Sequence, residues 1–136
     1  MTTAPLLDTH AWIWWVNGDS RLGKPIITAL DALPANDRPF LSDVSLLEIA
    51  VLVGQKRLIL PVPFDEWVEA AAHPRSVRSV PISPPVAAGV VRLAGTFRDP
   101  ADRVIVATSE TLNVPLLTRD KAIIRSRLVR RWTPTP

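Results

Sequence analysis

The sequence has no cysteine, only two histidines and no long apolar run. Without cysteine the chain has no disulfides, no thiolate metal ligands and no cysteine nucleophile, a composition that fits a reducing cytoplasm. No stretch approaches the roughly 20 apolar residues that a membrane-spanning helix requires. Residues 1–4 lack the basic segment that opens a signal peptide. We therefore expect a cytoplasmic protein with no membrane partner.

The remaining composition is that of an ordinary globular chain. Of 136 residues, 47% are hydrophobic and 21% are charged, which supplies enough apolar material for a buried core. The sequence shows no repeats and no linker. We therefore expect a single domain over residues 1–132, followed by a tail at residues 133–136.

Basic residues are concentrated near the end of the chain. Residues 119–131 contain six arginines and lysines against one acid, whereas residues 1–55 contain six acids and three bases. A basic segment on an otherwise mixed domain favours a polyanionic partner such as nucleic acid. A solvated surface on a small basic protein explains the same charge equally well, so charge alone does not decide between them.

Short apolar segments alternate with helical patterns along the chain. In residues 10–17, for example, Trp12, Trp15 and Val16 have the spacing of one helix face. Alternating strands and helices, joined by right-handed crossovers, predict a parallel sheet and an α/β fold. We expect strands at residues 5–7, 40–42, 77–82, 115–118 and 128–132, and helices at residues 10–17, 25–33, 46–53, 64–72, 83–93, 100–112 and 121–126.

Three of the five tryptophans lie within residues 12–15. Trp12 and Trp15 share a helix face, and Trp14 points elsewhere. Core packing accounts for one or two of these side chains. The third is expected at an interface, where tryptophan is enriched.

Carboxylates stand where several of these strands end or helices begin. Asp8 and Asp120 follow strands, Glu48 lies in the helix after the second strand, and Asp99 and Asp102 open another helix. The carboxyl ends of parallel strands share one edge, where open α/β folds place ligands. Carboxylates from these four segments, gathered there, would repel one another unless a divalent cation neutralised them. Without cysteine, the set favours Mg²⁺ or Mn²⁺ and metal-assisted phosphodiester hydrolysis.

The same acids also have structural explanations. Ser45-x-x-Glu48 fits a capping box, in which the glutamate bonds the N–H at the helix start. Asp99 fits an N-cap, and Asp102 lies in the first helical turn, where carboxylates are favoured. His10 is expected to pack or hydrogen-bond in its own helical turn rather than to bind metal.

Four segments carry a resemblance to a known family: Asp8-Thr9-His10-Ala11-x-x-Trp14-Trp15, Ser45-Leu46-Leu47-Glu48-Ile49-Ala50, Asp99-Pro100-Ala101-Asp102-Arg103-x-Ile105-x-Ala107 and Leu117-Thr118-Arg119-Asp120. In order and spacing they are similar to the acidic motifs of PIN-domain proteins, and most of all to VapC-type toxin ribonucleases. The resemblance implies a three-layer α/β fold with a central parallel sheet of about four to five strands flanked by helices. It also implies an RNA substrate, Mg²⁺ or Mn²⁺ as cofactor, a homodimer, and a cognate antitoxin protein that reaches into the acidic pocket.

The resemblance assigns the main roles by position. Asp8, Glu48, Asp102 and Asp120 match the acidic quartet of the family. Asp8, Asp102 and Asp120 are expected to hold metal, whereas Glu48 either holds metal, directly or through water, or acts as a base. Thr118 matches a hydroxyl that orients the first aspartate.

Five further residues have roles that the motifs leave open. Asp99, Thr9 and Ser45 support the quartet or serve only as cap and turn residues. Arg103 and Arg119 lie next to acids, where they either contact phosphate or form ion pairs with those acids.

Two other functions are compatible with the sequence. One is a binding module that keeps the acidic pocket without turnover. The other is a phosphotransfer domain with Asp8 as the phosphate acceptor. A haloacid-dehalogenase-like domain needs Asp-x-Asp, but His10 occupies the second place, and a receiver-like domain needs a lysine where Thr118-Arg119 stands. The leading hypothesis is therefore a metal-dependent endoribonuclease.

Overall fold

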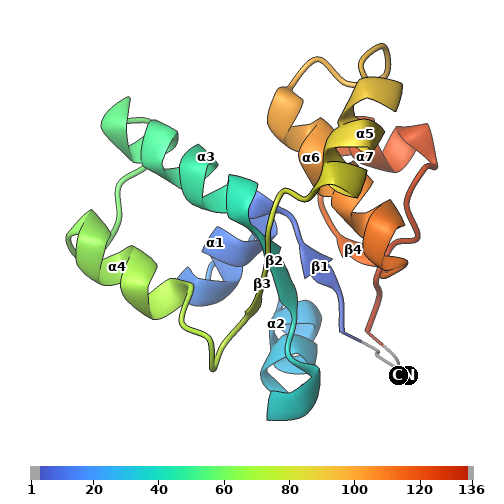
Figure 1. The fold of residues 1–136 in the computed structure, drawn as a ribbon. Helices are drawn as coiled ribbons and strands as arrows, with labels where there is room; N and C mark the ends of the chain where they lie inside the picture. Colours follow the sequence, from blue (N-terminus) through green and yellow to red (C-terminus); the bar gives the residue numbers. More distant parts are fainter. Residues whose placement is uncertain (1–3, 135–136) are drawn as a thin grey trace.

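A computed structural model describes residues 4–134. Residues 1–3, examined above for a signal sequence, and residues 135–136, the end of the predicted tail, lie outside the described residues. Four strands form one sheet with the order β3-β2-β1-β4, and every neighbouring pair is parallel (Figure 1). The predicted parallel α/β sheet is confirmed. The strands are β1 (Leu6–Leu7), β2 (Phe40–Ser42), β3 (Arg78–Val80) and β4 (Leu116–Leu117).

Seven α-helices and one 3₁₀ turn connect the described strands. Most of these helices begin with an aspartate or serine whose side chain caps the first turn, and some also have a proline at the first helical positions. Within residues 4–134, every helix is too short or too polar to traverse a bilayer. The helices are α1 (Thr9–Asn17), α2 (Lys24–Asp31), α3 (Asp43–Gly54), α4 (Phe64–Ala71), α5 (Pro84–Arg92), α6 (Pro100–Leu112) and α7 (Lys121–Ser126), and the 3₁₀ turn is η1 (Ala35–Asp37).

The helices cover both faces of the sheet. Adjacent residues of a strand point to opposite faces, so Leu6 and Leu116 join a core with α5, α6 and α7. Leu7 and Leu117 join a second core with α1, α2 and α4. Figure 1 shows these two groups of helices on opposite sides of the strands. The predicted three-layer arrangement is confirmed, with four strands.

The strand pairing fixes where the functional edge lies. Leu7 is in register with both Leu41 and Leu117, so β1 and β4 end together and β2 ends one residue later. The Asp8 N–H donates to the Leu117 carbonyl at 3.0 Å, which holds the first residue after β1 beside the end of β4. Residues that directly follow these strands therefore meet at one edge.

Most predicted elements match the structure to within a few residues at each end, and two of the differences need an explanation. The strand expected at residues 128–132 is reduced to a parallel bridge between Arg131 and Leu116 at the edge of β4. The helix expected at residues 46–53 begins earlier, at Asp43, because the Ser42 hydroxyl accepts the Val44 N–H at 3.2 Å and caps it. This earlier start changes the role of Ser45, as described below.

The contact between α5 and α6 leads to a stability prediction. A Cβ atom on Gly89 would lie 2.7 Å from the Ala107 Cβ, closer than real Cβ contacts. We expect Gly89→Ala to lower the free energy of unfolding by about 1–3 kcal/mol, measured by chemical denaturation. Gly54→Ala is the control, because nothing lies within 4 Å of a Cβ there. Equal stability of the two variants would contradict the prediction.

Candidate active site

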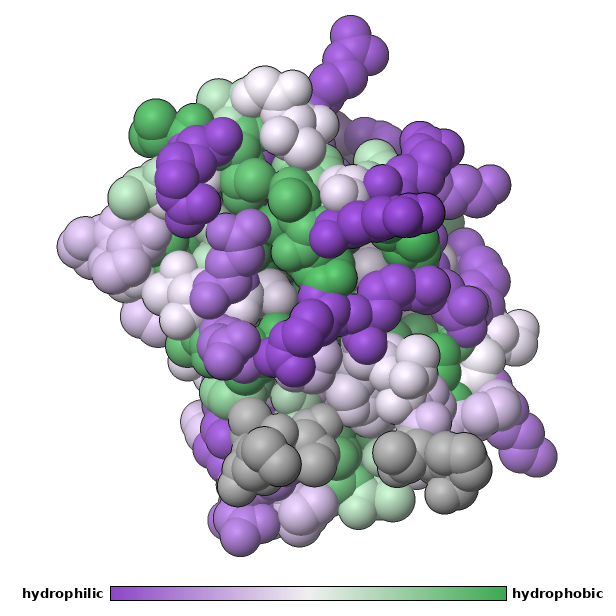
Figure 2. All heavy atoms as spheres, turned by 90° about the vertical axis from the view of Figure 1, so that its right-hand side faces the viewer, coloured by the Kyte–Doolittle hydropathy of each residue, from purple (hydrophilic) through white to green (hydrophobic). Residues whose placement is uncertain are grey.

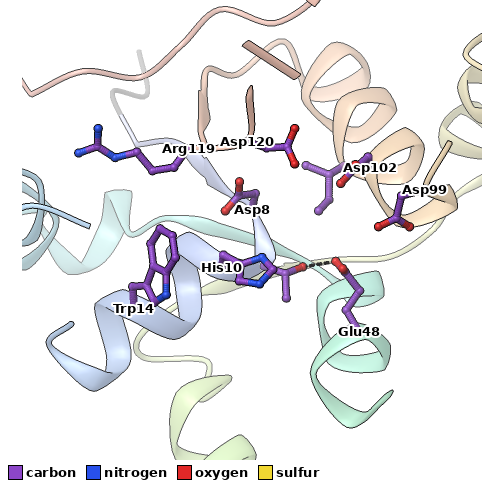
Figure 3. A pocket seen from close by; sticks show the side chains of 10 residues that line it. Asp8, His10, Trp14, Glu48, Asp99, Asp102, Arg119 and Asp120 are labelled. Atoms are coloured by element: carbon purple, nitrogen blue, oxygen red, sulfur yellow. Dashed lines mark hydrogen bonds between the residues drawn. The ribbon is translucent and has the colours of Figure 1, made fainter. Parts of the chain in front are cut away.

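Five carboxylates line one pocket of about 330 Å³ at the carboxyl edge of the sheet (Figure 3). They come from four segments of the chain that are far apart in sequence. The pocket therefore brings together the whole predicted quartet and Asp99. Its lining residues are Asp8, Thr9, His10, Trp14, Glu48, Asp99, Asp102, Ile105, Arg119 and Asp120.

Three of the acids are positioned by helix caps. Asp8, Asp99 and Asp120 precede α1, α6 and α7, and one side-chain oxygen of each accepts a backbone N–H of its helix at 2.7–3.0 Å. A helix N-terminus also favours negative charge. Because a carboxylate has two oxygens with several lone pairs, a cap leaves acceptor capacity for a second ligand. The cap role and a metal-binding role are therefore compatible.

Thr118 connects two of these acids. Its hydroxyl hydrogen-bonds the Asp8 carboxylate and accepts the Asp120 N–H at 3.0 Å. The side chain is buried at the end of β4. This geometry is compatible with the predicted role of Thr118, a hydroxyl that orients the first aspartate, which stays a prediction.

Glu48 is held by a hydrogen-bond chain that begins inside α3. The Thr9 hydroxyl donates to Glu48 Oε1, the contact drawn as a dashed line in Figure 3. Thr9 Oγ1 also lies 2.9 Å from Ser45 Oγ, and since the Thr9 proton is used on Glu48, Ser45 must be the donor. The capping-box hypothesis is wrong, because Ser42 caps α3 and Ser45 is buried within its first turn.

The pocket disfavours the ionised form of its own acids. Burial, followed by the charges of its four acidic neighbours, raises the pKa of Asp102 to about 7. Burial also raises the pKa of Glu48, with Asp99 and Asp8 adding to the effect and the Thr9 hydrogen bond opposing it. Burial raises the pKa of Asp8 against the hydrogen bonds from Thr118 and Ala11. A bound cation would relieve this repulsion.

The donor set fits a hard, hydrated cation. Most of the polar side chains that line the pocket are carboxylates, and carboxylate ligands suit Mg²⁺ or Mn²⁺ rather than Zn²⁺. Within residues 4–134, no group of three or more Asp, Glu, His or Cys side chains is placed so that it could hold a metal ion by itself. Mg²⁺ usually keeps several waters and uses only one or two carboxylates together with substrate phosphates. Asp8, Asp102 and Asp120 could supply those oxygens.

The two predicted phosphate-binding arginines lie in different surroundings. Arg119 lines the pocket, and its guanidinium donates to the Leu22 carbonyl at 2.7 Å. Arg103 instead donates to the carbonyls of Phe97 and Arg98 at 2.6 and 3.3 Å, and it is not among the lining residues. Arg103 therefore braces the loop before α6, and the structure does not bring it into the pocket.

The sequence motifs include Trp14 but assign it no role in the pocket, where it forms an aromatic wall. Trp12 is fully buried and Trp15 donates its indole N–H to Asp31 at 2.9 Å, whereas Trp14 lines the pocket. His10 is exposed, and its ring centroid lies 5.8 Å from that of Trp14. The available signal was that Trp14 lies off the helix face shared by the other two tryptophans.

A four-stranded parallel sheet, covered by helices on both faces and carrying a carboxylate pocket at its carboxyl edge, defines an α/β domain with an acidic site. The family model for the PIN domain matches residues 6–127, and the chain belongs to the PIN-domain family. The family resemblance noted in the sequence is confirmed. PIN-domain ribonucleases generally use divalent metal ions.

Individual relatives agree with this assignment. The chain is 37% identical over 134 residues to "Ribonuclease VapC22" of Mycobacterium tuberculosis, covering 98% of both proteins. Its fold is similar to that of a "Toxin-antitoxin complex from Klebsiella pneumoniae", with a TM-score of 0.65, 22% identity and coverage of 97% and 98%. It is also similar to FitAcB from Neisseria gonorrhoeae, with a TM-score of 0.67, 24% identity and coverage of 95% and 96%.

Proposed function

We propose that this chain is a metal-dependent endoribonuclease that acts in the cytoplasm as the toxin of a toxin–antitoxin pair. The observation that carries the proposal is the convergence of five carboxylates in one pocket at the carboxyl edge of the sheet. The sequence identity of 37% to a protein named a ribonuclease, which extends over 98% of both chains, supports the proposal.

In this proposal Asp8, Asp102 and Asp120 hold Mg²⁺ or Mn²⁺. When bound, such an ion lowers the pKa of a water and offsets charge on the phosphate. Glu48 accepts a proton from the attacking water or helps to hold the ion. The Thr9 hydroxyl occupies Glu48 Oε1, which leaves Oε2 for that proton. Thr118 keeps the Asp8 carboxylate oriented toward the pocket.

The basic end of the chain is proposed to bind the RNA backbone. α7 begins directly after Asp120, so its basic residues stand next to the acidic pocket. The face with α5, α6 and α7 carries long hydrophilic side chains that cross over apolar residues (Figure 2). Binding through these cations should weaken steeply with salt. The exposed cations of this segment are Lys121, Arg125, Arg127 and Arg131, along with Arg130, which donates to the Asn113 carbonyl.

The nuclease assignment is tested with purified protein and a panel of RNAs. We expect internal cleavage with Mg²⁺ or Mn²⁺ and none after chelation with EDTA, measured on denaturing gels. Protein that binds RNA but never cleaves it, with either ion and across many RNAs, would instead favour the binding-module alternative.

An apolar groove beside the pocket supports an antitoxin as partner. This hollow of about 430 Å³ lies between α3 and the start of α6, and it shares His10, Glu48 and Asp99 with the acidic pocket. On its wall Leu47 is 65% exposed and Val51 is 46% exposed. A segment with apolar side chains and a nearby cation would fill the groove and meet the acids together.

This leads to a test of the partner. We expect the product of a short open reading frame directly upstream to bind the protein, and Leu47→Asp to weaken that complex by tenfold or more, as about 1.4 kcal/mol or more would produce. Titration calorimetry measures the affinity. Val91→Asp on α5 is the matched control, because Val91 is 76% exposed and lies outside the groove. Equal weakening by both variants would exclude this groove as the contact.

The homodimer stays a prediction, which analytical ultracentrifugation of the purified protein can test.

A further inference from the structure

Besides the apolar groove, a smaller hollow lies directly beside the acidic pocket. It has a volume of about 160 Å³, and His10 and Trp14 line both hollows. A cavity of about 150 Å³ can hold benzene, so this one is large enough for one planar ring. Its lining residues are His10, Ile13, Trp14, Arg21, Leu52, Arg57 and Leu58.

The aromatic side of this hollow is formed by α1. The ring centroids of His10 and Trp14 lie 5.8 Å apart, and the ring planes are tilted by 54°. Because the rings are tilted, they do not cover each other's faces. Figure 3 shows both side chains beside the acids, with His10 between Trp14 and Glu48. A ring that enters here would contact aromatic surface.

Arg21 is fixed over the indole by the end of α1. Gly18, at a φ of 63°, ends the helix, and the Asp19 N–H then donates to the Trp14 carbonyl at 2.8 Å. The Asp19 carboxylate holds the Arg21 guanidinium at 2.7 Å, and the guanidinium carbon lies 5.2 Å from the Trp14 ring centroid. Since Asp19 offsets its charge, Arg21 presents a flat, preorganised stacking surface.

Arg57 provides a cation on another wall. It follows α3, lines this hollow and the apolar groove, and is exposed. Among residues 4–134 no acid pairs with it, and its hydrogen bond to Gln55 Oε1 is long at 3.4 Å. Its guanidinium is therefore available for a phosphate or for the edge of a base.

Aromatic rings, guanidinium planes and an apolar floor are the groups with which proteins bind unpaired bases of RNA. We propose that the hollow formed by Trp14, His10, Arg21 and Arg57 binds one unpaired base of the RNA, next to the phosphate that lies over the acids. This inference rests on the proposed nuclease function, because the acidic pocket would hold that phosphate. The base stacks on Trp14, and Arg57 contacts the adjoining backbone.

The test measures binding without cleavage. Each variant is made in an Asp8→Asn background, and the probes are a labelled ten-nucleotide oligouridylate and an abasic strand of equal length, followed by fluorescence anisotropy in Mg²⁺. We expect Trp14→Ala to weaken binding of the uridine strand about tenfold or more and to leave the abasic strand unchanged. Trp14→Phe keeps most of the preference for bases. Trp15→Ala, which alters a neighbouring tryptophan outside the hollow, keeps all of it.

Two results would overturn the proposal. One is a folded Trp14→Ala protein, checked by circular dichroism, that still prefers the uridine strand as the parent does. The other is a parent that binds both strands equally. Cleavage by the unmodified chain is scored separately. An absence of cleavage with an intact base preference counts against the nuclease function, and cleavage without any base preference counts against this subsite alone.

Discussion

Asp8→Asn should abolish metal-dependent RNA cleavage and leave the fold intact. Asp8 is 7% exposed and lies between Asp120 and the first turn of α1. Asparagine is also a good N-cap, so the bond from the Ala11 N–H can persist. Loss of one preorganised charged group typically costs about 100- to 1,000-fold in rate, and we expect at least this loss in kcat, measured with a labelled RNA.

Stability provides a second readout for the same variant. Burial raises the pKa of Asp8, so its ionised form is unfavourable in the folded protein at neutral pH. Without metal, Asp8→Asn should therefore have a Tm no lower than that of the parent. Asp65→Asn, an exposed acid on α4, is the control and should cleave at the parent rate. Cleavage by Asp8→Asn at the parent rate would remove Asp8 from the site.

Metal should stabilise the protein at pH 8 far more than at pH 5. The pKa of Asp102 is raised from 3.8 to about 7 by burial and by the other acids. In metal-free protein the folded state therefore binds more protons than the unfolded state between these two values. The contribution of Asp102 to the free energy of unfolding is therefore full below about pH 4. It falls as pH rises toward 7 and is lost above that value.

Divalent cations bind the ionised carboxylates, so they restore the lost free energy of unfolding only at pH values where the acids are ionised. An ion at about 100 times its Kd adds about 2.7 kcal/mol, which corresponds to a rise in Tm of several degrees at pH 8. Differential scanning fluorimetry with and without Mg²⁺ measures it. The hydrogen bonds from Arg21 lower the pKa of Asp19 to about 2. The contribution of Asp19 to stability is therefore lost as pH falls below about 4, so it does not change between pH 5 and pH 8.

Asp102→Asn separates the acidic pocket from other titrating groups. This variant should have a smaller decline of Tm between pH 4 and 7, to which Glu48 and Asp8 also contribute, and it should lose most of the rise with Mg²⁺. Asp65→Asn should keep both. A Mg²⁺ effect of the same size at pH 5 and pH 8, or one retained by Asp102→Asn, would show that these carboxylates do not bind the ion.

Local signals in the sequence predicted the parallel sheet and the positions of Asp8, Asp99 and Asp120 at the starts of helices. Apolar runs of strand length fixed β1, β2 and β4, and Asp99 before Pro100 predicted the cap that the structure has. These features depend on neighbours within a few residues, since a cap or a buried strand is decided by short-range hydrogen bonds and hydrophobicity. The shared edge then follows from the rule for parallel strands.

Packing between distant elements decided the remaining features of the site. Glu48 is held by Thr9, 39 residues away, and Arg119 donates to Leu22 across 97 residues. The capping-box interpretation of Ser45 is wrong because the cap lies at Ser42, three residues earlier in the chain, which places Ser45 inside the first turn of α3.

The sequence by itself determined which acids follow the strands, since that order is written in a local pattern. Only the tertiary structure decided that Glu48 turns toward them, that Trp14 forms the wall beside them, and that Arg103 stays outside. Those outcomes depend on how α1, α3 and α6 pack over the sheet, and no short stretch of sequence encodes the angle between two helices.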